Sequence, residues 1–238
     1  MTERRFQRID EVLRRRQPDL TFLAEDVYKP HNLSAMLRSA DAVGIGVVHA
    51  VTPTGGVPTF SATSASAQKW VELRVHGSLQ RALSVVRDQG MQVLAAHFSD
   101  RAVDYRDVDY ALPTCVLFGN ERSGVSAAAA GAADAHVSIP MLGMVPSLNV
   151  SVAAAVILFE AQRQRRAAGL YDRPSLSARE RNDRTVRWLY PRLAAHLDAL
   201  GQALPLLGER GGLPRGYPTL DQVHDDELEV ERPRGQRV

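Results

Sequence analysis

Short β-rich runs alternate with helical segments between about residues 20 and 160, and this alternation constrains the fold more than any other feature of the sequence. The expected strands are residues 20–24, 46–51, 71–75, 92–96, 115–118 and 136–139, and the expected helices among their connections include 32–42 and 78–89. Such an alternation predicts an α/β fold, with a parallel sheet that helices cover on both faces. Ligands of these sheets bind beyond the carboxyl ends of the strands.

Two extensions flank this core, which we place at residues 20–168. Residues 1–19 form an arginine-rich arm whose apolar residues Phe6, Ile9, Val12 and Leu13 recur at helical spacing, and Pro18 is expected to end that helix. The C-terminal extension, residues 169–238, begins with a weaker pattern that predicts one helix over about 178–200. Its last residues, 225–238, are mostly charged and are expected to be mobile.

The distribution of charge says more than the net charge of +2. Residues 1–16 contain six arginines against three acidic residues, and Arg163, Arg165 and Arg166 follow the apolar run 150–159. The arginine guanidinium is a planar, permanently charged fork that suits phosphate groups. The two clusters therefore indicate either a nucleic-acid surface or two solvated helix faces.

Several classes of protein are disfavoured. The apolar run 150–159 is far shorter than the ~20 residues of a membrane-spanning helix, and the charged start does not resemble a signal peptide. The single cysteine, Cys115, lies in an apolar run and is expected to be a buried spectator rather than a nucleophile. We expect a cytoplasmic protein without disulfides.

Common cofactor and metal motifs are incomplete. Residues 44–49 begin like a dinucleotide-binding loop but lack its last glycine and enter a strand. Residues 119–126 have the glycine spacing of a P-loop, but Val125 stands where the lysine is required. The seven histidines show no ligand spacing, so no metal is predicted, and a Gly-x-Ser-x-Gly elbow is missing.

Three segments carry polar residues at positions suited to chemistry. The first, residues 29–44, contains Asn32, which is a good helix N-cap, and Arg38. The second, residues 116–126, opens from a buried strand into a polar loop with Glu121. The third, residues 139–152, places Ser147 and Asn149 at the start of a helix. Taken singly, each segment also fits a structural reading: a capped helix, an ion pair of Glu121, and a second cap.

Taken together and in this order, the segments resemble the three motifs of the TrmH (SpoU) family of SPOUT-class RNA methyltransferases. The matching patterns are Asn-x5-Arg-Ser-Ala, Leu-Phe-Gly-Asn-Glu-x-x-Gly and Ile-Pro-Met-x-Gly-x-x-x-Ser-Leu-Asn-Val-Ser-Val-Ala. The resemblance extends over about residues 14–165. The short N-terminal arm is more similar to the members that methylate the ribose 2′-hydroxyl of guanosine 18 in the tRNA D-loop than to the rRNA members with a separate N-terminal domain.

This resemblance implies a fold, a cofactor and partners. The fold is the α/β knot, with a trefoil knot in the C-terminal half of the core. The cofactor is S-adenosylmethionine, the substrate is tRNA, and the protein is a homodimer through the knot region. The implied cofactor-binding residues are Ala95, Ala96, His97, Gly119, Asn120, Ile139, Met144 and Leu148. The implied RNA-binding residues are Arg8, Arg15, Arg16, Arg163 and Arg166.

The resemblance assigns the central catalytic role to Arg38, supported by Asn32, Glu121, Ser147 and Asn149. A guanidinium stays protonated in proteins, because its pKa is above about 12, so Arg38 is a poor general base. We interpret it as a clamp on phosphate or on the developing alkoxide, and the proton acceptor remains open.

Three other functions compete with this interpretation. The first keeps the fold and changes the RNA to rRNA or to another ribose of tRNA. The second is an RNA-binding protein with a degenerate active site, and the third is a small-molecule enzyme with an arginine anion clamp. The intact motif residues disfavour the second, and the third explains neither arginine-rich end.

Overall fold

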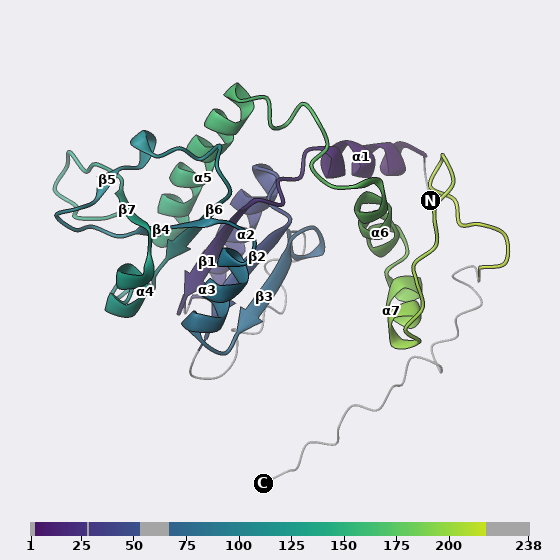
Figure 1. Cartoon of the computed structure of the whole chain (residues 1–238), viewed down its shortest axis with the longest axis horizontal. Helices are drawn as coiled ribbons and strands as arrows, with labels where there is room; N and C mark the ends of the chain where they lie inside the picture. Colours follow the sequence, from purple (N-terminus) through teal and green to yellow (C-terminus); the bar gives the residue numbers. More distant parts are fainter. Residues whose placement is uncertain (1–2, 28, 53–66, 218–238) are drawn as a thin grey trace, which may run out of the picture. The chain divides into compact units, whose positions relative to one another are not determined.

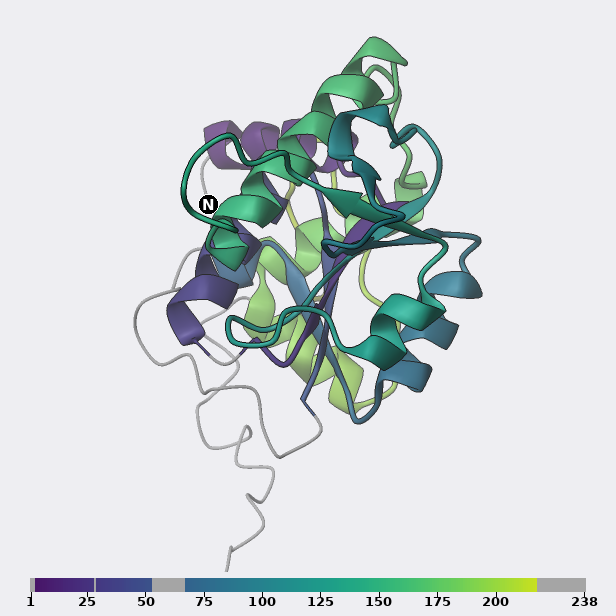
Figure 2. The ribbon, with the colours of Figure 1, turned by 90° about the vertical axis from the view of Figure 1, so that its left-hand side faces the viewer.

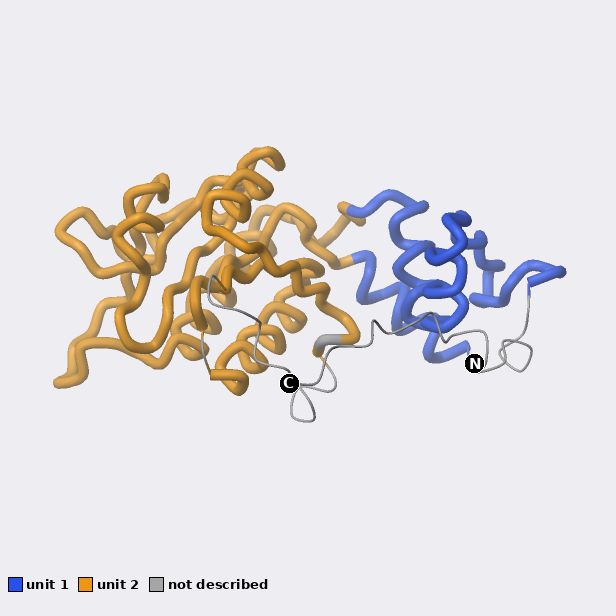
Figure 3. The backbone as a smooth tube through the Cα atoms, turned by 90° about the horizontal axis from the view of Figure 1, so that it is seen from below, with its two compact units in different colours: residues 1–14, 176–238 blue, residues 15–175 orange. Residues whose placement is uncertain are grey.

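The computed structural model describes residues 3–27, 29–52 and 67–217. The chain divides into two compact units, drawn in blue and orange in Figure 3. One unit comprises residues 15–175, and the other combines residues 1–14 with residues 176–238. The charged end, 225–238, lies outside the described residues.

A seven-stranded sheet forms the centre of the unit 15–175 (Figure 1). Its order is β3-β2-β1-β6-β4-β7-β5, and every neighbouring pair is parallel. The strands are β1 (Leu20–Glu25), β2 (Val47–Val51), β3 (Glu72–His76), β4 (Gln92–Ala96), β5 (Val103–Asp104), β6 (Thr114–Phe118) and β7 (Ala135–Ser138). The parallel sheet is confirmed. Strand β5 was not predicted, because two residues leave no periodic pattern. The trefoil knot stays a prediction.

Helices pack on both faces of this sheet (Figure 2). The helices of the unit are α2 (Pro30–Ala42), α3 (Leu79–Arg87), α4 (Ala127–Ala132) and α5 (Val150–Ala167), with 3-10 turns at Ala67–Lys69 and Tyr105–Asp107. Successive strand residues alternate between two buried clusters: Phe22 and Val116 pack with α2 and α5, whereas Leu23 and Leu117 pack with α3 and α4. Cys115 is fully buried in the second cluster, and burial raises the pKa of its thiol to about 12, as expected of a spectator.

Two buried arginines connect the segment before β1 to the rest of the unit. Arg165 on α5 is 0% exposed and donates to the Tyr110, Leu112 and Asp19 carbonyls, to Gln17 Oε1 and, at 2.6 Å, to Asp19 Oδ1. Arg16 is 1% exposed and donates to the carbonyls of Ile45 and Trp70 and to Asp41 Oδ1. These hydrogen bonds offset much of the cost of burying the two cations.

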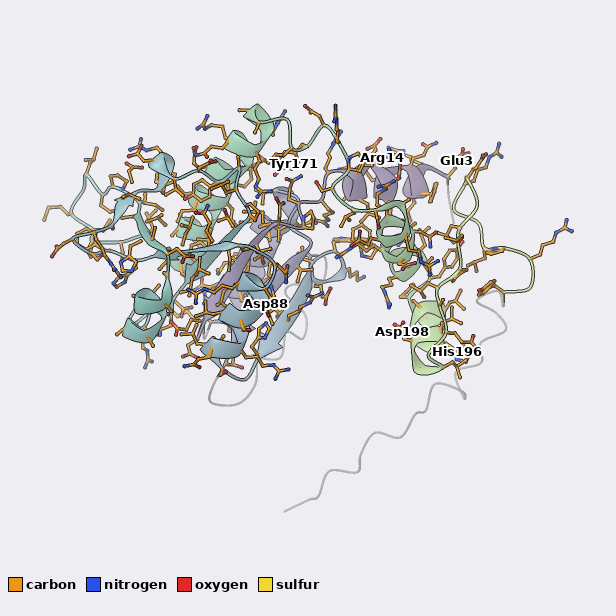
Figure 4. All side chains as sticks on the ribbon, in the orientation of Figure 1. Glu3, Arg14, Asp88, Tyr171, His196 and Asp198 are labelled. Atoms are coloured by element: carbon orange, nitrogen blue, oxygen red, sulfur yellow. The ribbon has the colours of Figure 1, made fainter. Side chains whose placement is uncertain are left out.

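The second unit is helical. It contains α1 (Glu3–Arg14), α6 (Ala178–Leu189) and α7 (Pro191–Ala199). Helix α1 buries Ile9 and Leu13 against Leu176. It ends at Arg14, earlier than Pro18. Residues of α6 and α7 share a small core with Leu204. The Asp198 side chain on α7, labelled in Figure 4, accepts hydrogen bonds from Arg187 on α6.

The prediction of one helix over 178–200 is wrong at its middle. Tyr190 leaves the helical region, with φ −129° and ψ 59°, and Pro191 begins a new helix. Proline has no N–H to donate to the preceding turn, and its ring clashes with that turn, so it is favoured at a helix start. Along the described stretches of chain, no helix is long and apolar enough to cross a membrane.

Candidate active site

The three polar segments meet beyond the carboxyl ends of β1 and β6. These strands are direct neighbours, with Ala24 opposite Phe118, so the residues after them lie together. Glu121 Oε1 accepts from Asn32 Nδ2 at 2.6 Å and from the Lys29 backbone N–H at 3.3 Å. The Asn149 side chain donates in turn to Asn32 Oδ1 at 3.3 Å. Side chains from all three segments thus form one hydrogen-bonded chain.

Asn32 reaches this chain from inside α2, and the prediction that it caps the helix is wrong. Lys29 is the N-cap residue and Pro30 opens the helix, because proline is well suited to the first helical position. Asn32 therefore lies within the first turn, 1% exposed. Its amide bridges Glu121 and Asn149.

Asn149 does cap its helix. Its Oδ1 accepts from the Ser151 backbone N–H at 2.8 Å and from Ser151 Oγ at 2.7 Å, and α5 begins at Val150. Because Oδ1 is occupied as an acceptor, the amide nitrogen must face Asn32. The capping contact therefore sets the direction of the hydrogen bonds from Asn149 to Asn32 to Glu121, in which each amide donates toward the Glu121 carboxylate.

The loop after β6 is closed by its own backbone. Asn120 and Gly124 exchange two backbone hydrogen bonds, of 3.1 and 3.0 Å. Asn120 Oδ1 also accepts from the backbone N–H groups of Arg122 and Ser123. A Cβ on Gly119 would lie 2.0 Å from the Gly124 backbone, so no side chain fits there. Glu121 is consequently held on a rigid loop.

Arg38 and Ser147 lie outside the hydrogen-bonded chain. Arg38 is exposed on α2, and across the described ranges its guanidinium makes no hydrogen bond or ion pair. Ser147 is exposed in the segment that leads to α5. Both side chains remain available to a ligand, unlike Asn32, which is already engaged.

The residues implied in cofactor binding are brought to adjacent strand ends. Strand β4 lies between β6 and β7, so the end of β4 at Ala95–His97, Gly119–Asn120 after β6 and Ile139 after β7 belong to three neighbouring strands. Met144 is 101% exposed on the segment after β7, and Leu148 is half-buried. Two further apolar side chains are exposed on these connections, Phe98 at 88% and Leu142 at 101%.

A polar cluster that sequence reasoning missed supports the end of β4. His136 on β7 lies 2.8 Å from Ser99 Oγ and 3.0 Å from an Arg101 nitrogen, and its ring meets that of His97 edge to face. Burial, followed by His136 and Arg101, lowers the pKa of His97. No sequence spacing linked these residues, because β4 and β7 become neighbours only in the sheet. Within the described residues, no group of three or more histidine, cysteine or acidic side chains could hold a metal ion.

The arginines predicted to bind RNA divide into two sets. Arg8, Arg15, Arg163 and Arg166 are exposed, with Arg8 paired to Glu11 and Arg163 to Glu160. Arg16 is buried, and its guanidinium donates to Asp41 and to two backbone carbonyls. A guanidinium that is buried in this way cannot reach a phosphate of bound RNA, so we assign Arg16 a structural role.

Comparison with known proteins places this arrangement in a family. Residues 19–159 match the SpoU rRNA methylase family, and residues 163–216 match the C-terminal SpoU rRNA methylase family. The tRNA (guanosine(18)-2′-O)-methyltransferase of Thermus thermophilus is 63% identical over 74% of this chain and 90% of its own. The Escherichia coli protein of the same name is 44% identical over 97% of this chain and 96% of its own.

Solved structures agree with the sequence matches and confirm the expected fold class. The A. aeolicus TrmH/SpoU tRNA modifying enzyme superimposes with a TM-score of 0.75 at 39% identity, covering 80% of this chain and 97% of its own. The SpoU methyltransferase AviRb of Streptomyces viridochromogenes, solved with the cofactor AdoMet, has a TM-score of 0.57 at 27% identity, with coverages of 63% and 62%. The chain belongs to the SpoU (TrmH) family of methyltransferases.

Proposed function

We propose that this protein uses S-adenosylmethionine to methylate the ribose 2′-hydroxyl of guanosine 18 in the tRNA D-loop. The observation that carries the proposal is the hydrogen-bonded chain Asn149–Asn32–Glu121, which joins all three family motifs at one edge of the sheet. The names of the Thermus and Escherichia relatives, which align over most of this chain, supply the substrate. A cytoplasmic location follows from the substrate.

The ends of β6, β4 and β7 suit the cofactor. An adenosine needs apolar contacts and backbone hydrogen-bonding groups, and Phe98, Leu142 and Met144 are exposed on the connections that leave β4 and β7. We assign binding to the backbone of Ala95, Ala96, His97, Gly119, Asn120 and Ile139, and to Met144 and Leu148. S-adenosylmethionine, when bound there, supplies an electrophilic methyl group.

We propose that Arg38 acts on the ribose rather than on the fold. Its exposed guanidinium has no competing partner in the described part of the chain, so it can clamp a phosphate or stabilise the developing alkoxide. Ser147 is another exposed polar residue of the three segments. Asn32 and Asn149 orient Glu121, and alignment of the hydroxyl with the methyl group supplies most of the catalysis.

The exposed arginines Arg8, Arg15, Arg163 and Arg166 are proposed to contact tRNA phosphates. Each such contact releases counterions, so affinity falls as salt rises. Replacing Arg8 with alanine should weaken tRNA binding and flatten its salt dependence. An unchanged salt dependence would show that Arg8 faces solvent and does not contact tRNA.

A homodimer through the region of α5 is part of the proposal. Val145, Val152 and Phe159 are between 47% and 58% exposed, and the last two are seven residues apart on the same side of α5. With Leu142 and Met144, they leave an apolar surface that a second copy would cover.

The test is incubation of the purified protein with S-adenosylmethionine and unmodified tRNA transcript, followed by nuclease digestion and mass spectrometry. We expect 2′-O-methylguanosine in the D-loop fragment. Methylation of a different nucleotide would refute the substrate and keep the reaction, whereas cofactor binding without methylation of tRNA would refute the proposed activity.

In the same assay, Arg38→Ala should reduce turnover by at least about 100-fold while cofactor affinity stays close to that of the wild type, because removal of one group that stabilises developing charge has this size of effect. Arg81→Ala is the matched control, since Arg81 is an exposed arginine on α3. Retained turnover in Arg38→Ala would refute the clamp.

A further inference from the structure

A second exposed arginine, in addition to Arg38, lies next to Glu121 on the rigid loop that follows β6. Arg122 is the next residue along the chain, and its side chain is exposed. Across the described ranges, its guanidinium makes no hydrogen bond or ion pair. The Arg122 side chain therefore does not hold this loop in place.

The backbone of Arg122 is fixed by groups that do not involve its side chain. Its N–H donates to Asn120 Oδ1 at 2.9 Å, and that same oxygen accepts from the Ser123 N–H at 2.8 Å and from Ser123 Oγ at 3.1 Å. The exchange of backbone bonds between Asn120 and Gly124 closes the loop, and Gly124 adopts the left-handed φ of +67° that the closure requires. The Cα of Arg122 is thus pre-positioned at the rim of the site.

Four exposed arginines of the same unit are paired with nearby carboxylates. These pairs are Arg74–Glu72, Arg87–Asp134, Arg106–Asp104 and Arg163–Glu160. Arg122, like Arg38 and Arg81, makes no such pair within the described residues, but it alone of these three directly follows Glu121 on the closed loop. The Glu121 carboxylate does not neutralise it, because that carboxylate is turned toward Asn32 and the Lys29 N–H. A cation held on a rigid loop and left without a counter-charge is suited to an anionic ligand.

We infer that Arg122 binds a backbone phosphate of the tRNA next to the target nucleotide and so positions the ribose at Glu121 and Asn32. The inference rests on the proposed function and adds a residue that the motif comparison leaves as a variable position. Lys29, whose backbone N–H donates to the Glu121 carboxylate, is a further exposed cationic residue next to the site. Arg122 is a positioning residue, since the phosphate that it binds is not the reacting group.

The experiment compares wild-type protein with Arg122→Ala, Arg122→Lys and the control Arg81→Ala, all as full chains. The KM for tRNA, the dissociation constant for S-adenosylmethionine, and tRNA binding without cofactor at several salt concentrations are measured. In Arg122→Ala, we expect the KM for tRNA to rise about tenfold, because a lost hydrogen bond to a charged group has this effect. The salt slope should fall by about 0.7, the value for one phosphate of a single strand.

Arg122→Lys should recover most of the affinity, because it keeps the charge, and all variants should bind S-adenosylmethionine like the wild type. The inference is overturned if Arg122→Ala has the same tRNA affinity and salt slope as Arg81→Ala. It is also overturned if cofactor affinity falls in parallel, since the side chain would then support the loop. A wild-type protein that binds cofactor but methylates no tRNA would instead refute the proposed function, and the inference with it.

Discussion

At the scale of single residues, identical side chains have opposite roles because of burial. Arg16 and Arg165 are almost fully buried and satisfy backbone carbonyls and carboxylates, whereas Arg38 and Arg122 are exposed and make no such contacts in the described part of the chain. An arginine count therefore overstates the cationic surface. At Asn149, the role of the side chain depends on hydrogen-bond direction. Its Oδ1 caps α5, so its Nδ2 is the atom that faces Asn32.

The same scale contains a buried pair of histidines. His49 Nδ1 on β2 and His76 Nε2 on β3 are 2.9 Å apart, and their rings are stacked. Burial is the main cause that lowers the pKa of His49 from 6.5 to about 4, with His76 and Arg74 contributing. Burial also lowers the pKa of His76, ahead of Arg81 and Arg74. The folded protein thus keeps His49 neutral at pH values where the unfolded chain binds a proton.

The free energy of unfolding should therefore fall as the pH drops from about 6.5 toward 4. In this window the unfolded chain takes up a proton at position 49 and the folded protein does not, so lower pH favours unfolding. The loss should be on the order of 2 kcal/mol, allowing for some solvent screening. Urea unfolding at several pH values tests this. His49→Asn should flatten the dependence, and His31→Gln, at an exposed position, should not. Equal slopes in His49→Asn and wild type would contradict the assignment.

At the scale of elements, one strand–loop–helix segment positions Glu121 and the loop that carries it. Strand β6 ends at Phe118, and the loop at 119–124 turns back on itself before Ser126 caps α4. Glu25 at the end of β1 accepts from both the N–H and Oγ of Ser126, which ties α4 to the neighbouring strand. The loop is held at both ends, and Glu121 and Arg122 lie between.

A methyl group on Gly119 should disturb this segment. The added Cβ would overlap the backbone of Gly124 and Val125, which must move apart. Gly119→Ala is expected to lower the free energy of unfolding by about 3 kcal/mol, near the upper end for overpacking, and to weaken S-adenosylmethionine binding. Thermal unfolding and calorimetric titration measure the two effects.

Gly131→Ala is the control for that substitution. Gly131 lies in α4, a Cβ added there would meet nothing within 4 Å, and alanine is a better helix former by roughly 1 kcal/mol. This protein should be as stable as the wild type or slightly more so. If Gly119→Ala were as stable as the wild type, the loop could open without a cost in the free energy of unfolding, which would contradict the prediction.

At the scale of the whole molecule, the chain builds two units from interleaved segments. The N-terminal residues 1–14 and the residues after 175 form the helical unit, and the sheet unit lies between them in sequence. All residues assigned to the cofactor and to catalysis belong to the sheet unit, as does the exposed apolar surface of Val145, Val152 and Phe159. That apolar surface is the reason for expecting a dimer in solution.

The proposed dimer predicts that Phe159→Asp sediments as a monomer at concentrations at which the wild type is a dimer. A carboxylate in a desolvated apolar interface costs several kcal/mol, whereas at an exposed position it costs little. Circular dichroism should confirm that the variant is folded, and Leu206→Asp, at an exposed position in the helical unit, serves as the control. A wild-type monomer, or a Phe159→Asp dimer, would contradict the proposal.

Local pattern alone determined much of this molecule. Apolar spacing located six of the strands and the helices α2, α3 and α5, because burial on a sheet face or a helix stripe leaves that signal in sequence, whereas the short, alanine-rich α4 was not predicted. The motif residues identified the family and the edge of the sheet that carries the site. The short strand β5 and the break at Pro191 lay beyond that reasoning, although the proline itself was a usable signal for the break.

Tertiary structure alone decided which polar groups meet. Asn32, Glu121 and Asn149 are joined because β1 lies beside β6 and α2 packs on α5, an order that the sequence does not display. The same order brings His136 to Ser99 and buries Arg16 while Arg122 stays exposed. Spacing along a chain reports which face of an element a residue occupies. Its partners depend on strand order and packing, which arise from contacts between distant segments.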